Sequence, residues 1–312
     1  MKSIVVDILG GDNNEREILI GLKDYFKEMT YKLVIAGPKE LIKEYFNDEE
    51  VIILDTNKEV TNHTSPMAIL HDMEDTALVL SLNYLKENDD AVGLLTVSST
   101  GCVLTGSIFK LGLINGIKTP VLASEMYRMD FSRFLIADCG ANIDVTSNML
   151  LDFARIGNAF EKAKGIKNPK IGLLNIGVEE KKGNKVMKEA YSLLKDSNMN
   201  FIGNIEFNSI YLGLADCIVC DGVIGNSIIK NTEGVAKAII NSVNLDTKSK
   251  DKINHLFNYN DFGSAIFLGP KKIILKAHGE ANRNTIIESL KNMCELDKGQ
   301  LIEALEKEFS KW

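Results

Sequence analysis

Residues 4–37 read IVVDILGGDNNEREILIGLKDYFKEMTYKLVIAG, and this stretch decides the fold class. The short apolar run Ile4–Ile8 is typical of a buried strand. A glycine-rich turn follows it and leads into the amphipathic stretch Glu15–Lys27, before a second apolar run at Lys32–Gly37. A strand, a helix and a second strand in this order are typical of a βαβ unit, in which the two strands are parallel. The stretch therefore predicts a parallel sheet that is covered by helices.

The same alternation continues along the chain and predicts its organisation. Further strands are predicted over residues 51–54, 91–97, 121–124, 133–138, 170–176, 199–202, 217–220 and 271–276. Further helices are predicted over residues 39–46, 68–87, 98–113, 148–164, 185–196, 226–243 and 283–308. The polar connections Asp55–Ser65 and Asn244–Asp261 do not divide the chain cleanly. We therefore expect a single continuous α/β domain over residues 1–312, with a three-layer α/β/α architecture and a mainly parallel sheet. A division of this domain into two lobes is compatible with the pattern.

The composition excludes several classes of protein. The 312 residues are 45% hydrophobic and 25% charged, which is an ordinary globular balance, and the net charge of −7 argues against broad binding to nucleic acid. The five cysteines are odd in number and no secretory segment precedes them, so we expect a reducing cytoplasmic compartment. No apolar run approaches the roughly 18 residues of a membrane span. Arginine is scarce, so an anion site must use backbone N–H groups and lysine.

Six predicted turns that follow strands are rich in glycine, asparagine, aspartate and serine. In open α/β sheets, ligands bind outside the carboxyl ends of the strands, where glycine lets the backbone approach them and helix N-termini attract anions. Ordinary turns and helix caps use the same residue types, so each turn alone also has a purely structural interpretation. Together they predict one polar, anion-tolerant cleft. The turns are residues 10–13, 98–101, 138–142, 175–177, 203–206 and 221–226.

Eight motifs include these turns and extend over nearly the whole chain. They are Val6–Asn13, Thr96–Cys102, Asp138–Asp144, Lys167–Asn184, Phe201–Glu206, Asp221–Asn226, Phe262–Ser264 and Lys276–Gly279. Each motif alone is weakly specific, whereas the ordered set is strongly specific. In this order the set resembles that of the bacterial phosphate acyltransferases of phospholipid synthesis, the PlsX type.

The resemblance implies a fold like that of phosphotransacetylases and isopropylmalate dehydrogenases, assembled as a homodimer. It implies transfer of an acyl group from an acyl-carrier-protein thioester to inorganic phosphate, which gives an acyl phosphate for phospholipid synthesis. It implies neither a metal nor an organic cofactor. Two alternatives stay open: a phosphotransacetylase-like enzyme that uses acyl-CoA, and a catalytically silent homologue that binds acyl groups or phosphate and regulates a partner.

The reaction needs few catalytic side chains. Phosphate is already an anionic nucleophile, so no Ser-His-Asp triad is required, and the protein must supply a cradle for phosphate and donors to the developing oxyanion. The catalytic candidates are His278, as proton donor to the leaving thiolate, together with Asn226, Asp221 and Asp12. The candidates for binding substrate or phosphate are Gly10, Gly11, Ser98, Ser99, Thr100, Gly101, Asn142, Asn175, Gly177, Lys182, Asn204, Gly222 and Gly225.

Two departures from the family pattern bear on activity. The predicted helix 68–87 carries the acidic stretch Asp72–Thr76 where the family has the basic segment KKDSS, and acidic residues near an anionic substrate favour the silent homologue. Cys102 stands where the family has alanine, at a predicted helix N-terminus. A thiol with a lowered pKa there would permit an acyl-S-enzyme route, whereas the structural interpretation is a small buried residue.

Two further segments predict what the protein does not bind. The connection Asn244–Asp261 is short and polar and shows no apolar face, so we expect weak or no membrane contact. Cys217 and Cys220 lie within a predicted strand, which favours core residues over a zinc or redox site.

Overall fold

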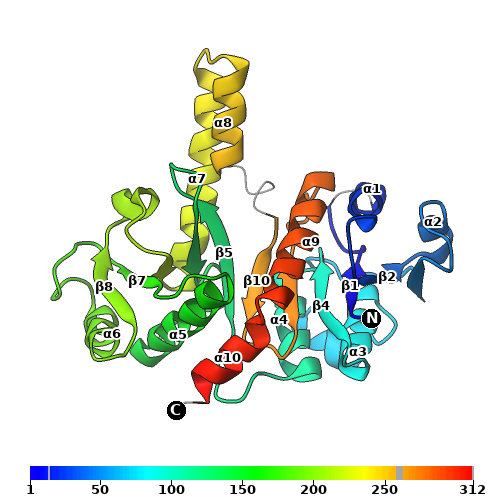
Figure 1. The fold of residues 1–312 in the computed structure, drawn as a ribbon, viewed down its shortest axis with the longest axis horizontal. Helices are drawn as coiled ribbons and strands as arrows, with labels where there is room; N and C mark the ends of the chain where they lie inside the picture. The colour runs from blue at the N-terminus through cyan, green and yellow to red at the C-terminus, as the bar shows by residue number, and fades with distance from the viewer. Residues whose placement is uncertain (13–14, 258–262, 311–312) are drawn as a thin grey trace. The chain divides into compact units, whose positions relative to one another are not determined.

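The computed structural model describes residues 1–12, 15–257 and 263–310. These residues form two compact units, of which unit 1 contains residues 1–114 and 263–298, and unit 2 contains residues 115–262 and 299–312. Each unit has its own strands and its own helices (Figure 1). Asn13 and Phe262, which belong to two of the quoted motifs, lie outside the described residues.

Unit 1 is built on a mainly parallel set of strands in the order β3-β2-β1-β4-β11-β10. Neighbouring strands are parallel except for the pair of β10 and β11, which is antiparallel. The strands are β1 (Ser3–Asp7), β2 (Lys32–Gly37), β3 (Val51–Asp55), β4 (Ala91–Thr96), β10 (Ala265–Leu268) and β11 (Ile273–Lys276). The helical segments are α1 (Glu15–Phe26), α2 (Lys39–Lys43), η1 (Pro66–Leu70), α3 (Ala77–Glu87), α4 (Thr100–Gly106), η2 (Ser107–Leu111) and α9 (Arg283–Lys298).

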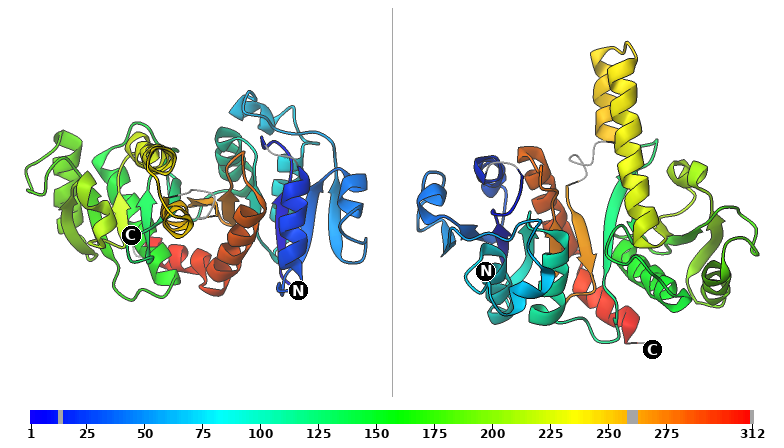
Figure 2. Two further views of the ribbon diagram at one scale, coloured as in Figure 1. Left: turned by 90° about the horizontal axis from the view of Figure 1, so that it is seen from above. Right: turned by 180° about the vertical axis from the view of Figure 1, so that it is seen from behind.

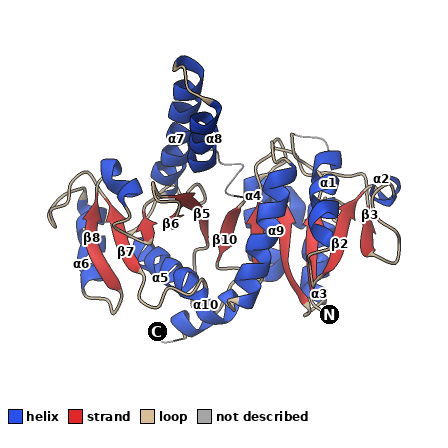
Figure 3. Ribbon diagram, turned by 45° about the horizontal axis from the view of Figure 1, so that its top comes forward, coloured by secondary structure: helices blue, strands red, loops and turns tan. Residues whose placement is uncertain are grey.

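The strand order of unit 1 reverses at β1, since β2 and β3 lie on one side of it and β4 and β11 lie on the other. Crossovers between parallel strands are right-handed, so this reversal places α1 and α3 on opposite faces of the strands. Helix α9 packs against α1, whereas α3 packs against β1 to β4, so helices cover both faces (Figure 3). The gap where the order reverses is the usual place for a ligand in such folds.

Unit 2 repeats this architecture with the strand order β5-β6-β9-β7-β8. The strands are β5 (Val121–Tyr127), β6 (Arg133–Ala137), β7 (Lys170–Leu174), β8 (Asn200–Ile205) and β9 (Cys217–Val219). Only β5, among these strands, runs antiparallel to its neighbour. The helical segments are α5 (Ser147–Ala163), α6 (Lys185–Lys195), η3 (Phe207–Leu212), α7 (Gly222–Ser242), α8 (Thr247–Phe257) and α10 (Leu301–Phe309).

Helices α7 and α8 run side by side and extend beyond the strands of unit 2 (Figures 1 and 2). The expectation of a polar connection without an apolar face at residues 244–261 was wrong over residues 247–257, because these form α8. Its last turns place apolar side chains on one side, and Leu256 is buried against Tyr127 of β5. Val235 and Ile239 of α7 are exposed, and so is Val243, the C-cap residue of this helix. Apolar groups are therefore present in this region, and the argument against membrane contact that assumed their absence does not hold. Among the described residues, no helix has the length and apolar character of a membrane span.

Three other expectations need correction. The predicted helix 68–87 is interrupted, because residues 71–76 form a turn between η1 and α3. The short strand β10 was missed, and helix α7 begins at Gly222 rather than at Asn226, because Asp221 caps it. The mainly parallel α/β fold itself is confirmed.

The acidic stretch that departs from the family pattern lies on that turn. Asp75 forms an ion pair with Lys58, and the Thr56 hydroxyl donates to the Asp75 carbonyl oxygen at 2.7 Å. Asp72 and Glu74 are exposed. Hydrogen bonds to the 56–58 loop, which is distant in sequence, therefore hold this stretch outside the helix that the local pattern predicts.

Candidate active site

Three turns that are distant in sequence meet at the carboxyl ends of β1, β4 and β11 in unit 1. The Asp12 backbone N–H donates to the Gly279 carbonyl oxygen at 2.8 Å. A Cβ on Gly11 would lie 3.1 Å from that oxygen and 3.1 Å from Val97, so Gly11 lets the three chain segments approach one another. The turns occupy the place where the strand order reverses, which is the expected ligand position.

Gly10 is required by its conformation and by its surroundings. Its φ is +86°, and a Cβ there would overlap the Val60 carbonyl oxygen. Its backbone N–H donates to Glu59 Oε2 at 3.2 Å. The first turn is thereby anchored to the loop that follows β3.

The Ser98–Gly101 turn leads into α4. Ser98 is buried, whereas Ser99 is the N-cap residue of α4 and its side chain makes no capping hydrogen bond. The first backbone N–H groups of a helix have no partner within it, so this turn presents donors that suit an anion. Thr100 and Gly101 are partly exposed at the same place.

Asp7, at the end of β1, is the functional candidate that sequence reasoning missed in this unit. Its carboxylate accepts hydrogen bonds from Thr96 Oγ1 at 2.7 Å, Ser98 Oγ at 2.8 Å and the Leu9 backbone N–H at 3.1 Å. Burial raises the pKa of Asp7 to about 6, against the lowering effect of these hydrogen bonds. The signal in the sequence was an acidic residue inside an apolar run, three residues before the predicted turn.

His278 and Asp12 lie on the other two turns of this group. His278 is partly buried, and its Nδ1 accepts a hydrogen bond from the Glu280 backbone N–H at 3.3 Å. Asp12 is exposed, and its carboxylate lies against Gly279, where a Cβ would overlap it. The two side chains therefore belong to the same cluster of turns as Ser98.

Cys102 does not have the surroundings of a reactive thiol. It is fully buried in α4, and its Sγ lies 3.6 Å from the Thr64 carbonyl oxygen. Burial raises the pKa of its thiol, whereas a nucleophilic cysteine needs a lowered pKa. The structural interpretation of Cys102 as a small buried residue is therefore favoured.

In unit 2, the loop after β6 packs against the N-terminus of α7. Asp138 is buried and its carboxylate accepts hydrogen bonds from the backbone N–H groups of Gly140, Ala141 and Asn142 at 2.8–3.0 Å. The Gly222 backbone N–H donates to the Asn142 carbonyl oxygen at 2.7 Å. Burial raises the pKa of Asp138. This loop is thus held as one preformed structure. Asp138 begins one of the predicted turns, but it was not among the candidate site residues.

The polar side chains at and near the start of α7 differ in their hydrogen bonds and in their exposure. The Asp221 carboxylate accepts the Ile224 backbone N–H at 2.9 Å and therefore caps the helix. The amide nitrogen of Asn142 donates to the Pro120 carbonyl oxygen at 3.0 Å and to Asp138, so both of its protons serve the loop. Asn226 is exposed on the second turn of α7. A Cβ on Gly225 would overlap the Asp138 carbonyl oxygen.

A second group in unit 2 follows β7 and β8. Buried Asn175 donates from Nδ2 to Asn204 Oδ1 and to the Lys182 carbonyl oxygen, both at 3.2 Å. Asn204 in turn donates to the Glu179 carbonyl oxygen at 2.9 Å. The two asparagines therefore brace the loop that contains Gly177 and Lys182. The Lys182 ammonium is about half exposed and lies 3.7 Å from Glu179.

Within each unit, the structure thus brings the predicted turns to the carboxyl edge of its parallel strands. That the turns of both units face one cleft stays a prediction.

Cys217 and Cys220 are buried core residues, as expected. Within residues 1–12, 15–257 and 263–310, no cluster of histidine, cysteine or acidic residues suits a metal ion.

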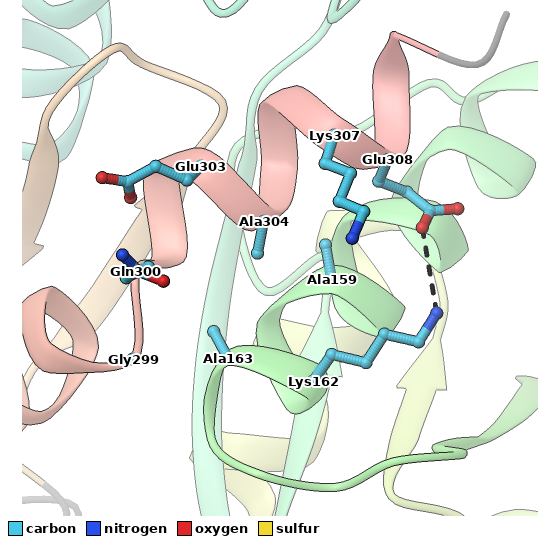
Figure 4. A pocket seen from close by; sticks show the side chains of 9 residues that line it. All are labelled: Ala159, Lys162, Ala163, Gly299, Gln300, Glu303, Ala304, Lys307 and Glu308. Carbon is cyan, nitrogen blue, oxygen red and sulfur yellow. Dashed lines mark ion pairs between the residues drawn. The ribbon is translucent and has the colours of Figure 1, made fainter.

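A pocket of about 450 Å³ lies between α5 and α10 of unit 2 (Figure 4). Small side chains such as Ala159, Ala163 and Ala304 line it, and Lys162 Nζ lies 3.9 Å from Glu308 at its rim. None of the predicted site residues lines it. We therefore place the candidate site at the strand-end turns and not in this pocket.

Comparison with known proteins identifies the family. A model of a family described as "Fatty acid synthesis protein" matches residues 2–303. The chain belongs to the fatty acid synthesis protein family. A relative of this protein named phosphate acyltransferase, from Clostridium tetani, is 36% identical over 326 residues, which cover 98% of this chain and 97% of the relative. The resemblance inferred from the ordered motifs is therefore confirmed.

Two solved structures have a fold similar to that of this chain. A phosphotransacetylase from Streptococcus pyogenes has a TM-score of 0.64 and 20% identity, with 97% of this chain and 94% of that chain covered. A branched-chain phosphotransacylase from Enterococcus faecalis has a TM-score of 0.63 and 16% identity, with 94% and 98% covered. At these identities the likeness shows the fold alone, and it confirms the expected phosphotransacetylase-like architecture of this member of the fatty acid synthesis protein family.

Proposed function

We propose that the protein is an acyltransferase that moves an acyl group from an acyl-carrier-protein thioester to inorganic phosphate. The observation that carries the proposal is the near full-length match to phosphate acyltransferases, at 36% identity. The site supports it, because unit 1 offers the N-terminus of α4 and a glycine turn at the place where the strand order reverses. This combination suits a phosphate ion that reacts while it is held by backbone donors.

The reaction needs no covalent enzyme intermediate. A phosphate oxygen attacks the thioester carbonyl carbon, the C–S bond breaks, and the thiolate of the carrier leaves with a proton. The protein holds the two reactants together and stabilises the oxyanion that develops on the carbonyl oxygen. The products are an acyl phosphate and the free carrier, for use in phospholipid synthesis.

The proposed roles follow the positions of the side chains. In unit 1, the backbone from Ser98 to Gly101, together with Gly10 and Gly11, cradles phosphate, and His278 protonates the leaving thiolate. In unit 2, Asn226 is the exposed donor of α7, whereas Asp221 acts through the helix cap. Lys182 supplies positive charge on a loop that Asn175 and Asn204 hold in place.

An assay of the purified protein tests the proposal. The protein is incubated with phosphate and either an acyl-carrier-protein thioester or acyl-CoA, and acyl phosphate is trapped as the hydroxamate. We expect hydroxamate with the carrier thioester and much less with acyl-CoA. A preference for acyl-CoA would instead indicate a phosphotransacetylase-like enzyme, and no product with either donor would indicate a silent homologue.

Replacement of Asn226 by alanine is expected to lower kcat/KM at least tenfold. This lower bound lies beneath the loss of about 10²–10³ that is typical of one oxyanion donor in a buried site, because Asn226 is exposed to water. Asn231→Ala is the matched control, since Asn231 is exposed on the same helix and belongs to no predicted turn. Equal activity of the two variants in the hydroxamate assay would remove Asn226 from the site.

Replacement of Cys102 by alanine is expected to leave kcat/KM within about twofold. Direct attack by phosphate does not use the thiol, and the buried cysteine has a raised pKa. The hydroxamate assay measures the rate, and circular dichroism confirms folding. A folded but inactive variant, together with a thioester trapped on the parent protein, would show that an acyl-S-enzyme is formed instead.

The proposal extends to partners and compartment. The protein is expected to act as a cytoplasmic homodimer with acyl carrier protein as its protein substrate, and without nucleic acid. The net charge of −7 supports the expectation that it binds no nucleic acid, and the family assignment supports an acyl carrier as substrate. Light scattering after size-exclusion chromatography measures the oligomeric state, and a monomer at micromolar concentration would contradict the dimer.

A further inference from the structure

We propose that Asp7 is the positioning residue of the phosphate subsite, because its carboxylate fixes the backbone before Gly10 and the Ser98 hydroxyl in one arrangement. The proposal rests on the proposed function, since it assumes that phosphate binds at these turns of unit 1. Asp7 does not itself touch phosphate. It is only 1% exposed and lies beneath the turns that it joins.

The hydrogen bonds of Asp7 connect two segments that are about 90 residues apart in sequence. One oxygen, Oδ1, accepts the Leu9 backbone N–H, and the other, Oδ2, accepts both the Thr96 and the Ser98 hydroxyls. Thr96 Oγ1 also accepts the Ser98 backbone N–H at 3.0 Å. The result is a closed network in which the ends of β1 and β4 and both following turns share one carboxylate.

The observed set of hydrogen bonds requires a carboxylate at Asp7. All three groups that face Asp7 donate to it, so each occupies a lone pair of the carboxylate. A hydroxyl could accept a proton from residue 7 only if it turned its own proton away from the carboxyl group. A neutral carboxylic acid or an asparagine would present a donor to one of these groups, so the backbone N–H would lose its acceptor or a hydroxyl would have to turn and give up its hydrogen bond to residue 7. A buried polar group that loses its hydrogen bond costs about 1–3 kcal/mol. Movement of one of the turns would reduce this cost.

Movement of either turn changes the phosphate cradle. Leu9 immediately precedes Gly10, and Ser98 immediately precedes Ser99, the N-cap residue of α4. Small displacements of positioning groups are costly, since a shift of about 1 Å can lower a rate about 10²-fold. We therefore expect the charge on Asp7 to control the affinity for phosphate rather than the handling of the acyl donor.

The buried position of Asp7 favours its protonation in mildly acidic solution. Its pKa is raised to about 6, mainly by burial, and the Glu59 carboxylate on the loop after β3 contributes in the same direction. Asp12, on the turn after β1, and His278 and Glu280, on the turn after β11, are further titratable groups among the described residues of the cluster. Below about pH 6, protonation of Asp7 in the wild-type protein should therefore weaken phosphate binding. Asp7→Asn should weaken it in the same way at every pH.

The test compares the wild-type protein with Asp7→Asn between pH 5 and pH 8. At pH 8 we expect the KM for phosphate to be about tenfold higher in the variant, with kcat and the KM for the acyl thioester within about threefold. The ratio of the KM for phosphate in the variant to that in the wild-type protein should fall towards one at pH 5, with a midpoint near pH 6. The ionisation of phosphate itself affects both proteins equally and cancels in this ratio. A ratio independent of pH would overturn the positioning role of the charge.

Two further variants separate positioning from stability. Thr96→Val removes one hydroxyl that is fully buried and cannot reach phosphate, and we expect it to raise the KM for phosphate about threefold. This variant decides the question if Asp7→Asn does not fold. The control is Asp216→Asn in unit 2, where Asp216 accepts Arg128 Nη2 and the Lys170 backbone N–H, both at 2.9 Å. It should lower stability and leave the KM for phosphate unchanged.

Calorimetric titration with inorganic phosphate distinguishes failure of this proposal from failure of the proposed function. A wild-type protein that binds phosphate but forms no acyl phosphate would contradict the function alone, and the Kd of the variants would then replace KM in the test. A wild-type protein that binds no phosphate would overturn both. Unchanged phosphate affinity in folded Asp7→Asn and Thr96→Val would overturn the role of Asp7 alone.

Discussion

Gly225→Ala is expected to destabilise unit 2 by about 3 kcal/mol or more. The added Cβ would overlap the Asp138 carbonyl oxygen, and the next nearest atoms are also backbone, so no side chain can move away to relieve the contact. Overpacking of well-packed sites typically costs ~1–3 kcal/mol, and a clash with backbone belongs at the upper end. Urea unfolding followed by circular dichroism measures the loss.

The same helix provides the matched control for this prediction. Gly234 also lies in α7, but a Cβ there would meet no other atom within 4 Å. Gly234→Ala should therefore stabilise the helix by up to about 1 kcal/mol, since alanine has the higher helix propensity. Equal effects of the two substitutions would show that the contact between α7 and the Asp138 loop does not form.

The second large effect concerns pH and Glu161 of α5. Glu161 is 4% exposed, and burial together with the nearby Glu125 carboxylate raises the pKa of Glu161 to about 8, despite the lowering effects of Lys164 and Arg128. In the unfolded chain a glutamate titrates near pH 4.5. The folded protein therefore binds more protons than the unfolded chain between about pH 4.5 and pH 8, and its stability falls as the pH rises through this window.

Glu161→Gln should remove this dependence. At about 1.4 kcal/mol for each pKa unit, the buried carboxyl lowers the free energy of unfolding by roughly 4 kcal/mol between pH 5 and pH 9. We expect the variant and the wild-type protein to be similar at pH 5, and the variant to be several kcal/mol more stable at pH 9. Glu306→Gln, at an exposed position on α10, is the control. Parallel stability curves for wild-type protein and Glu161→Gln would contradict the buried neutral form of Glu161.

Much of the fold could be predicted because its strands and helices have strong local patterns. The run Lys32–Gly37 coincides with β2, and the amphipathic stretch Glu15–Lys27 differs from α1 by one residue. The four-residue strand β10 was missed, since such a short apolar run has no period that distinguishes strand from loop. Helix α8 was missed because its apolar side chains occupy only its last turns, where they pack on Tyr127.

Part of the candidate site could also be predicted, because some of its features are local sequence patterns. The glycine turns are local features, and at Gly10 the positive φ that favours glycine is observed. The roles of Asp7 and Asp138 were not predicted, since each carboxylate acts through the groups that surround it after folding. Asp7 in particular meets Thr96 and Ser98 only when β1 and β4 pair.

The sequence by itself thus determined the α/β class, the order of the turns and the family, because strand and helix periods and ordered motifs are properties of neighbouring residues. Only the tertiary structure decided which groups are buried and which donors are already used. It showed Cys102 enclosed in α4, the Asn142 amide committed to its own loop, and Glu161 facing Glu125. Burial and hydrogen bonding depend on segments far apart in the chain, and they set the pKa values and the free donors on which chemistry depends.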